Sequence, residues 1–300
     1  MQVTPELFLG TTVGFAASAM WAISVVVYRS QSKEIRPLAI SSIKMWVALA
    51  FMSIVVVLPF RPSPFLVPIE SLVYLALSIS LGAVIGDTIY LISQERIGVS
   101  YAFPIAMSFP ILTYFLAILF LGDVLVPSRL FGTVVTVGGL ILISREQNKA
   151  DEDGLSANLD PLGISLAFLT MVMFATGTVL LEIGVTGVDP VDANFVRVLF
   201  GSAEFVPLFL LARHQGMPMP TQRAAKIVAF AGLFGMAIGS LLYVWMVKLI
   251  GAAMGSVIGS TSPLFAVPIS VLYLKERLTA LAAVGVLATV IGVMLVVVAF

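Results

Sequence analysis

Two stretches of this chain, 81-LGAVIGDTIY-90 and 234-FGMAIGSLLY-243, carry the same pattern of glycines and end on the same tyrosine. The offset between them is 153 positions, and it continues without a gap along the rest of the sequence. Six of the nine glycines before residue 148 fall on a second glycine at this offset, where roughly one match is expected by chance. We therefore predict an internal repeat, with one copy in residues 1–147, a linker in 148–159 and a second copy in 160–300.

The composition indicates a membrane protein. Of the 300 residues 60% are hydrophobic and only 11% are charged, with a mean hydropathy of +1.10, whereas soluble domains carry about a quarter charged residues. A membrane-spanning helix needs about 20 apolar residues. Ten stretches qualify: 7–28, 37–59, 71–93, 99–121, 127–144, 160–181, 190–212, 226–247, 253–274 and 279–299. Backbone groups in hydrocarbon must be satisfied within the segment, so the predicted fold is an all-α polytopic bundle.

The number of spans per copy predicts how the copies are related. Five is odd, so the second copy enters the membrane from the opposite side and the two five-helix repeats are inverted. Inverted repeats are typical of secondary transporters, in which two copies exchange conformations around a central site. A duplicated scaffold without a transport role is the alternative.

Several function classes are excluded by the residues present. The formal net charge is zero, so there is no basic surface for nucleic acid. There is no cysteine and a single histidine, so we expect no metal site. The sequence has no Walker A loop, no HExxH and no GxSxG, so we expect neither an enzyme nor an ATP-driven pump, and no cofactor.

The loops carry their basic residues unevenly. Eleven Lys and Arg fall in the loops on one side of the predicted bundle and three in those on the other. Because basic loops stay in the cytoplasm, we predict a multi-pass protein of the cell inner (plasma) membrane with both termini outside.

Two basic residues lie inside predicted spans at equivalent positions of the repeat. Lys44 and Arg197 each follow a matched proline, Pro37 or Pro190, by seven residues. A charge at membrane depth normally faces a cavity or the bundle interior, which makes both residues candidates for binding a substrate carboxylate or phosphate. Snorkelling of a long side chain to the interface is the alternative.

Two acidic residues also lie inside spans, and neither is duplicated. Asp87 aligns with Ser240, and Glu204 aligns with Phe51. These acids either pair with the buried bases or carry a proton, which burial of a carboxylate favours.

Prolines interrupt the fourth and ninth spans at matched positions. Pro110 and Pro263 weaken their helices there, and such breaks in corresponding helices point to a central site, so we predict hinges at both. Plain kinks without a binding role are the alternative. In the last spans, paired glycines seven residues apart line one helix face, which predicts close helix packing: Gly132 with Gly139, and Gly285 with Gly292.

Short motifs in both copies resemble a known family. The run 262-SPLFA-266, the run 274-LKERLT-279 and the tripeptide 20-MWA-22 are similar to the EamA-type repeat of the drug/metabolite transporter superfamily. The resemblance spans the whole chain and implies a ten-helix inverted-repeat fold with a central cavity, in a family where exporters of amino acids and related metabolites are prominent. The sequence departs from the pattern at Asp123, usually Glu, at Lys275, commonly Gly, and at Lys44, commonly Arg.

The leading functional hypothesis is an exporter or exchanger of amino acids or similar small zwitterions. The alternatives are a proton-coupled exporter of lipophilic or cationic compounds, with Asp87 or Glu204 as proton carrier, and a non-transporting membrane component or lipid-carrier flippase subunit. The expected partners are a small-molecule substrate, the lipid bilayer and possible coupling protons, for a monomer or homodimer. The residues expected to line the substrate site are Lys44, Arg197, Trp21, Tyr90, Tyr101, Ser108, Tyr243, Ser260 and Thr261.

Overall fold

The computed structural model describes residues 4–31, 34–58, 65–148, 160–273 and 280–298, and the regular structure within these ranges is helical throughout. The first copy holds α1 (Pro5–Gln31), α2 (Pro37–Val57), α3 (Ile69–Ile79), the π-helical segment η1 (Ser80–Gly86), α4 (Asp87–Ile97), α5 (Val99–Ala106), α6 (Phe109–Phe120) and α7 (Pro127–Asn148). The second holds α8 (Pro161–Val185), α9 (Pro190–His214), α10 (Gln222–Gly232), the π-helical η3 (Leu233–Gly239), α11 (Ser240–Gly259), α12 (Ser262–Tyr273) and α13 (Ala280–Val297).

Within the described ranges, eight helical stretches are long and apolar enough to cross a membrane. The longest of them, Gln222–Gly259, is divided by a break at Gly251, where φ is 78°, and its last turns together with α12 form a ninth segment. The helix α7, whose apolar part is shorter, is the tenth. The prediction of an all-α polytopic membrane protein is confirmed.

Proline and aspartate set where the helices begin. Proline starts α2, α7, α8 and α9, where its missing N–H costs nothing and its fixed φ suits a first turn. The Asp160 and Asp189 carboxylates cap α8 and α9 by accepting the amides of Leu162 and Val191. These signals are local, which is why the sequence alone places the helix starts well.

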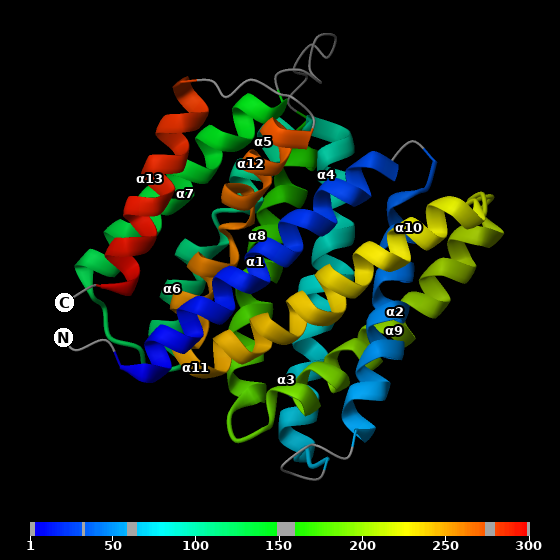
Figure 1. The fold of residues 1–300 in the computed structure, drawn as a ribbon, viewed down its shortest axis with the longest axis horizontal. Helices are drawn as coiled ribbons and strands as arrows, with labels where there is room; N and C mark the ends of the chain where they lie inside the picture. Colours follow the sequence, from blue (N-terminus) through cyan, green and yellow to red (C-terminus); the bar gives the residue numbers. More distant parts are fainter. Residues whose placement is uncertain (1–3, 32–33, 59–64, 149–159, 274–279, 299–300) are drawn as a thin grey trace.

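The packing has the exchange symmetry expected of a duplicated fold (Figure 1). In the first copy α1 packs against α10, η3, α11 and α12 of the second, and in the second copy α8 packs against α3, η1, α4, α5 and α6 of the first. Single contacts repeat too: Gly10 lies against Ile250, and its counterpart Gly163 lies against Ile97. The inverted repeat is therefore visible in three dimensions. The proposed copy boundaries stay a prediction, since most of the linker lies outside the described residues.

Two helix pairs join like elements of the two copies, α2 with α9 and α7 with α13. Figure 1 shows α7 and α13 side by side at one edge of the bundle. A Cβ added to Gly139 would lie 2.6 Å from the Gly285 carbonyl oxygen, and one added to Gly292 would lie 2.6 Å from that of Gly132. The predicted close packing through these four glycines is confirmed, and their order shows that the helices run antiparallel.

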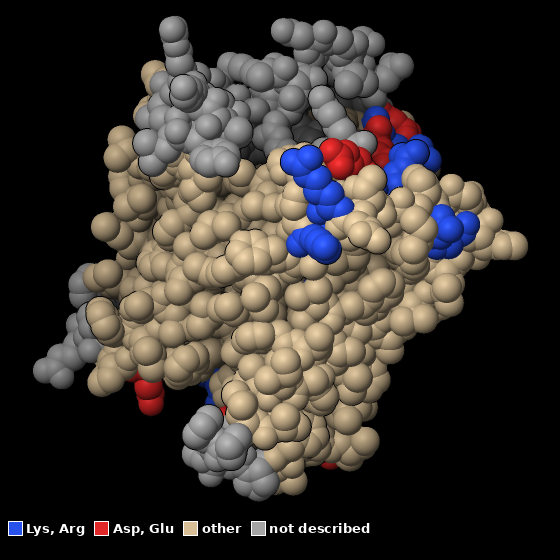
Figure 2. Space-filling view, turned by 45° about the vertical axis from the view of Figure 1, so that its right-hand side comes forward, with Lys and Arg blue, Asp and Glu red and all other residues tan. Residues whose placement is uncertain are grey.

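The surface is divided as a membrane demands. Figure 2 shows a broad belt without Lys, Arg, Asp or Glu, with most of the visible charged side chains toward the upper end of the molecule and a few at the lower end. Apolar side chains such as Phe8, Leu119 and Leu287 are more than 60% exposed. Such exposure would be costly in water, so this belt faces hydrocarbon.

Candidate functional site

The charged interior lies beside the π-helical segments. Each copy widens to a π-helix at the same place in its third span, η1 in the first and η3 in the second. Single π turns inside α-helices are rare and occur frequently at functional sites. Asp87 is the first residue after η1 and Ser240 the first after η3. The asymmetry seen in the sequence between these two positions therefore sits directly at the widened turns.

In the first copy this position forms an ion pair. Lys44 Nζ on α2 lies 3.2 Å from Asp87 Oδ2 on α4. The Lys44 side chain is 17% exposed and that of Asp87 33%, so the pair is largely shielded from solvent. Lys44 therefore has its compensating charge within the protein.

In the second copy the equivalent contact has no carboxylate. Arg197 on α9 is 8% exposed; its Nε donates to Ser78 Oγ at 3.0 Å and its Nη1 to Ser240 Oγ at 3.3 Å. Ser240 in turn donates to Asn194 Oδ1 at 2.8 Å. Among the described residues no carboxylate contacts this guanidinium. Arg197 is thus a buried cation held by hydroxyl groups alone, in the position where Lys44 has Asp87.

Glu204 and Arg197 stand on the same face of α9 but do not meet. Ser80 donates its hydroxyl to the Glu204 carboxylate, while Ser78 accepts from Arg197. Two different serines near the start of η1 therefore bind the two charged side chains, Ser78 the guanidinium and Ser80 the carboxylate. Of the two ion pairs considered from the sequence, Lys44 with Asp87 is present, and Arg197 with Glu204 is not formed.

Aromatic rings lie next to the arginine. The Trp21 ring on α1 packs against the Tyr243 ring, with centroids 5.1 Å apart and planes tilted by 45°, and its indole N–H donates to the Gly235 carbonyl at 2.9 Å. The Tyr243 hydroxyl lies 3.2 Å from that of Thr178 on α8, within range of the Arg197 charge. Trp21, Tyr243 and Arg197 from the predicted set therefore come together across three spans.

The first copy has a plainer version of this arrangement. The Tyr90 ring lies 6.4 Å from Phe174, which in turn lies 5.8 Å from Phe109 beside the break in the fourth span. Phe174 is the repeat counterpart of Trp21. Tyr90 therefore occupies the place of Tyr243 without an indole or an arginine beside it.

The predicted breaks are present at both prolines. Pro110 is the second residue of α6 and Pro263 the second residue of α12, each just after an interrupted turn. The hydroxyls beside them bond to their own helices: Ser108 donates to the Pro104 carbonyl, Ser260 to Val257 and Thr261 to Ile258. Tyr101 is 40% exposed and takes part in none of these contacts. A hinge role stays a prediction.

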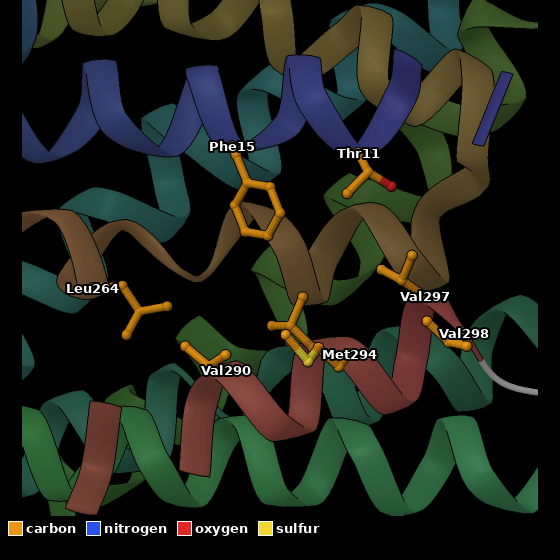
Figure 3. Close-up of a pocket in the computed structure, with 8 residues that line it drawn as sticks. Thr11, Phe15, Leu264, Val290, Met294, Val297 and Val298 are labelled. Atoms are coloured by element: carbon orange, nitrogen blue, oxygen red, sulfur yellow. The ribbon is translucent and has the colours of Figure 1, made fainter. Parts of the chain in front are cut away.

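A surface cleft of about 190 Å³ lies elsewhere, between α1, α12 and α13 (Figure 3). Its walls are apolar apart from Thr11, with Phe15, Leu264, Val290 and Met294 among them. A polar substrate would lose its hydrogen bonds with water there without replacing them, so this cleft is not the site of such a substrate. In the described residues, no group of three His, Cys, Asp or Glu side chains is placed to hold a metal ion.

Sequence reasoning missed the residues that complete the site: Ser78, Ser80, Asn194, Thr178 and Phe174. Ser and Thr are common in apolar helices and carry no spacing signal of their own. Phe174 had a signal, since it aligns with Trp21 at the repeat offset.

The ion pair in the first copy makes a direct prediction. Asp87→Asn is expected to lower the unfolding free energy by about 1 to 3 kcal/mol, because it leaves the Lys44 ammonium partly buried without its counter-charge. Thermal unfolding in detergent measures this change. Lys44→Met together with Asp87→Asn should recover most of the loss; if the double variant is as unstable as the sum of the two single ones, the side chains are not coupled.

Comparisons with known proteins agree with this architecture. The model of the EamA-like transporter family matches residues 8–145 and again residues 161–298. A curated relative, an uncharacterised transporter of Archaeoglobus fulgidus, is 23% identical over 285 residues, which cover 94% of this chain and 96% of that protein. A solved crystal structure superimposes with a TM-score of 0.74 at 15% identity, over 96% of each chain. The chain belongs to the EamA-like transporter family.

Proposed function

We propose that this transporter exports or exchanges amino acids or similar small zwitterions, and that Arg197 binds the carboxylate of the substrate. The observation that carries the proposal is the buried guanidinium without a carboxylate among the described residues. A buried charge is costly unless it is paired, and such residues at membrane depth mark substrate pathways. A substrate carboxylate would supply the missing partner.

Arg197 suits this role better than Lys44, although both were candidates from the sequence. Lys44 is already neutralised by Asp87, whereas the bonds of Arg197 go to neutral hydroxyls. A guanidinium also offers a planar fork of donors that matches a carboxylate. The neighbouring Trp21 and Tyr243 rings provide an apolar surface with polar edges beside it.

The inverted repeat supports alternating access as the mechanism. The site lies between α9 and α11 of the second copy and α3 of the first copy. Movement of the two copies relative to each other would change the bond between Arg197 and Ser78, which crosses from the second copy to the first. The matched breaks at Pro110 and Pro263 would allow the fourth and ninth spans to bend during the exchange.

We further propose that the protein lies in the cell inner (plasma) membrane with both termini outside. Five of the six exposed cations in the described part of the chain lie at ends of spans that topology puts on one side, namely Arg36, Arg96, Arg213, Arg223 and Lys226, and Lys248 lies on the other. That distribution follows the rule that basic loops remain cytoplasmic.

The alternative, a proton-coupled exporter with Asp87 or Glu204 as carrier, requires existing contacts to break. In each cycle Asp87 would have to leave Lys44, or Glu204 would have to lose the hydrogen bond from Ser80. Arg197 would then have no assigned partner. The carboxylate substrate explains the arginine and leaves these contacts intact.

A matched ligand series tests the proposal. Purified protein is expected to gain thermal stability with amino acids and to show no gain with the corresponding amino acid amides, because an amide retains the shape and lacks the negative charge. Counterflow of radiolabelled amino acids in proteoliposomes provides the transport readout. Equal stabilisation by acids and amides would contradict carboxylate recognition, and stabilisation by lipophilic cations alone would favour the alternative.

A further inference from the structure

A single carboxylate holds the start of a transmembrane half-helix in the second copy. Glu182, close to the end of α8, accepts a hydrogen bond from the backbone N–H of Ala252. Ala252 directly follows Gly251, whose positive φ of 78° divides α11. The bond therefore satisfies one of the free amides at the start of the second part of α11, and it is made by a different helix.

This bond joins two groups of helices at one end of the bundle. Ala253 packs in a cluster with Tyr114 and Ala117 of α6, so the second part of α11 and the end of α6 form one unit. On the other side, α8 carries Glu182. Since α8 also packs directly against α6 and α11, the Glu182 bond adds a charged contact at the end of that packing, and closure of this end depends in part on it.

The first copy cannot build the same bond. Gly98, the counterpart of Gly251, has nearly the same φ of 77°, so the helix break is duplicated. The position equivalent to Glu182 is Arg29, and a guanidinium has no acceptor for a backbone N–H. Because inverted repeats place equivalent positions at opposite membrane faces, this contact is found at one face within the described residues.

We propose that Glu182 is a proton-operated latch for that face, where the N-terminal end of α1 also lies. The charged carboxylate makes a charge-assisted bond to the Ala252 amide, favoured further by the positive end of the helix dipole. Protonation removes the charge and weakens both interactions. The end of α8 then separates from the unit of α6 and α11, and this face opens.

The other charged groups at this face do not replace the latch. From the elements packed around α8 and α11 they are Glu6 of α1, Glu70 of α3, Asp123 after α6, Arg129 of α7, Asp189 and Asp192 at the start of α9, and Lys248 of α11. Among these described groups, Asp123 is the one whose charge acts on the Glu182 carboxyl. Lys248 donates to the Val188 carbonyl at 2.7 Å, and Asp192 accepts from the Leu66 amide. Since Asp123 is also a titratable acid, the experiment must separate it from Glu182.

Distance measurements test the latch without any substrate. The chain has no cysteine, so spin labels can be attached at Thr186→Cys, at the end of α8, and at Val124→Cys, after α6, both at exposed positions. Pulsed electron resonance then measures the separation in lipid nanodiscs between pH 8 and pH 4. We expect the distance distribution to move to longer values as the pH falls.

Three variants identify the group responsible. Glu182→Gln should show the longer distances at every pH, since it is uncharged throughout. Glu70→Gln, an exposed acid on the same face, and Asp123→Asn should keep a pH-dependent change. The proposal is overturned if the distances do not depend on pH in the unmodified chain, if Glu182→Gln responds to pH as that chain does, or if the response disappears in Asp123→Asn.

Discussion

Arg197→Ala is expected to abolish saturable transport and to weaken substrate binding by at least about 30-fold. Removing one partner of a buried, hydrogen-bonded charge pair costs about 2 to 5 kcal/mol, and about 1.4 kcal/mol corresponds to a tenfold change in affinity. Arg197 has hydroxyl partners only, so its loss leaves no protein carboxylate uncompensated and the fold should survive. Counterflow and ligand-induced thermal shift measure both effects.

Two companion variants make the result specific. Arg197→Lys retains the charge but loses the planar fork of donors, so partial activity with weaker binding is expected. Lys44→Arg keeps the ion pair with Asp87 and should leave the apparent affinity nearly unchanged. If Arg197→Ala transports with unchanged affinity while remaining folded, the arginine does not bind the substrate.

The second large effect concerns the helix pair α7 and α13. Gly139→Leu is expected to destabilise the protein by about 3 kcal/mol or more, because the new Cβ would already lie 2.6 Å from the Gly285 carbonyl and the backbones cannot move apart without losing their contact. A lowered midpoint of thermal unfolding in detergent, followed by size-exclusion chromatography, measures the loss.

The adjacent glycine is a matched control. Gly138 is exposed, and a Cβ added there would meet nothing within 4 Å. Gly138→Leu changes the composition and the hydropathy of α7 equally and should alter stability by less than about 0.5 kcal/mol. Equal losses in the two variants would mean that helix propensity, not interhelical distance, causes the effect.

Much of the architecture followed from the sequence because its signals are periodic or local. The uniformly apolar spans had to be helices, since hydrocarbon offers the backbone no other partners. The glycine register at an offset of 153 predicted the repeat, and the glycines seven residues apart predicted close packing of the last spans, while the structure showed that these two spans pack on each other. Proline identity placed the breaks before Pro110 and Pro263.

The partners of the buried charges could not be predicted in the same way. The sequence by itself determined that Lys44 and Arg197 are equivalent and that Asp87 and Ser240 are not. Only the tertiary structure decided that Asp87 contacts Lys44 and that Ser240 contacts Arg197. It also decided that Arg197 and Glu204 bind different serines, Ser78 and Ser80, and do not bind each other. The reason is physical: helix periodicity follows from neighbours along the chain, whereas a contact between spans depends on how far each helix is rotated and shifted against the others.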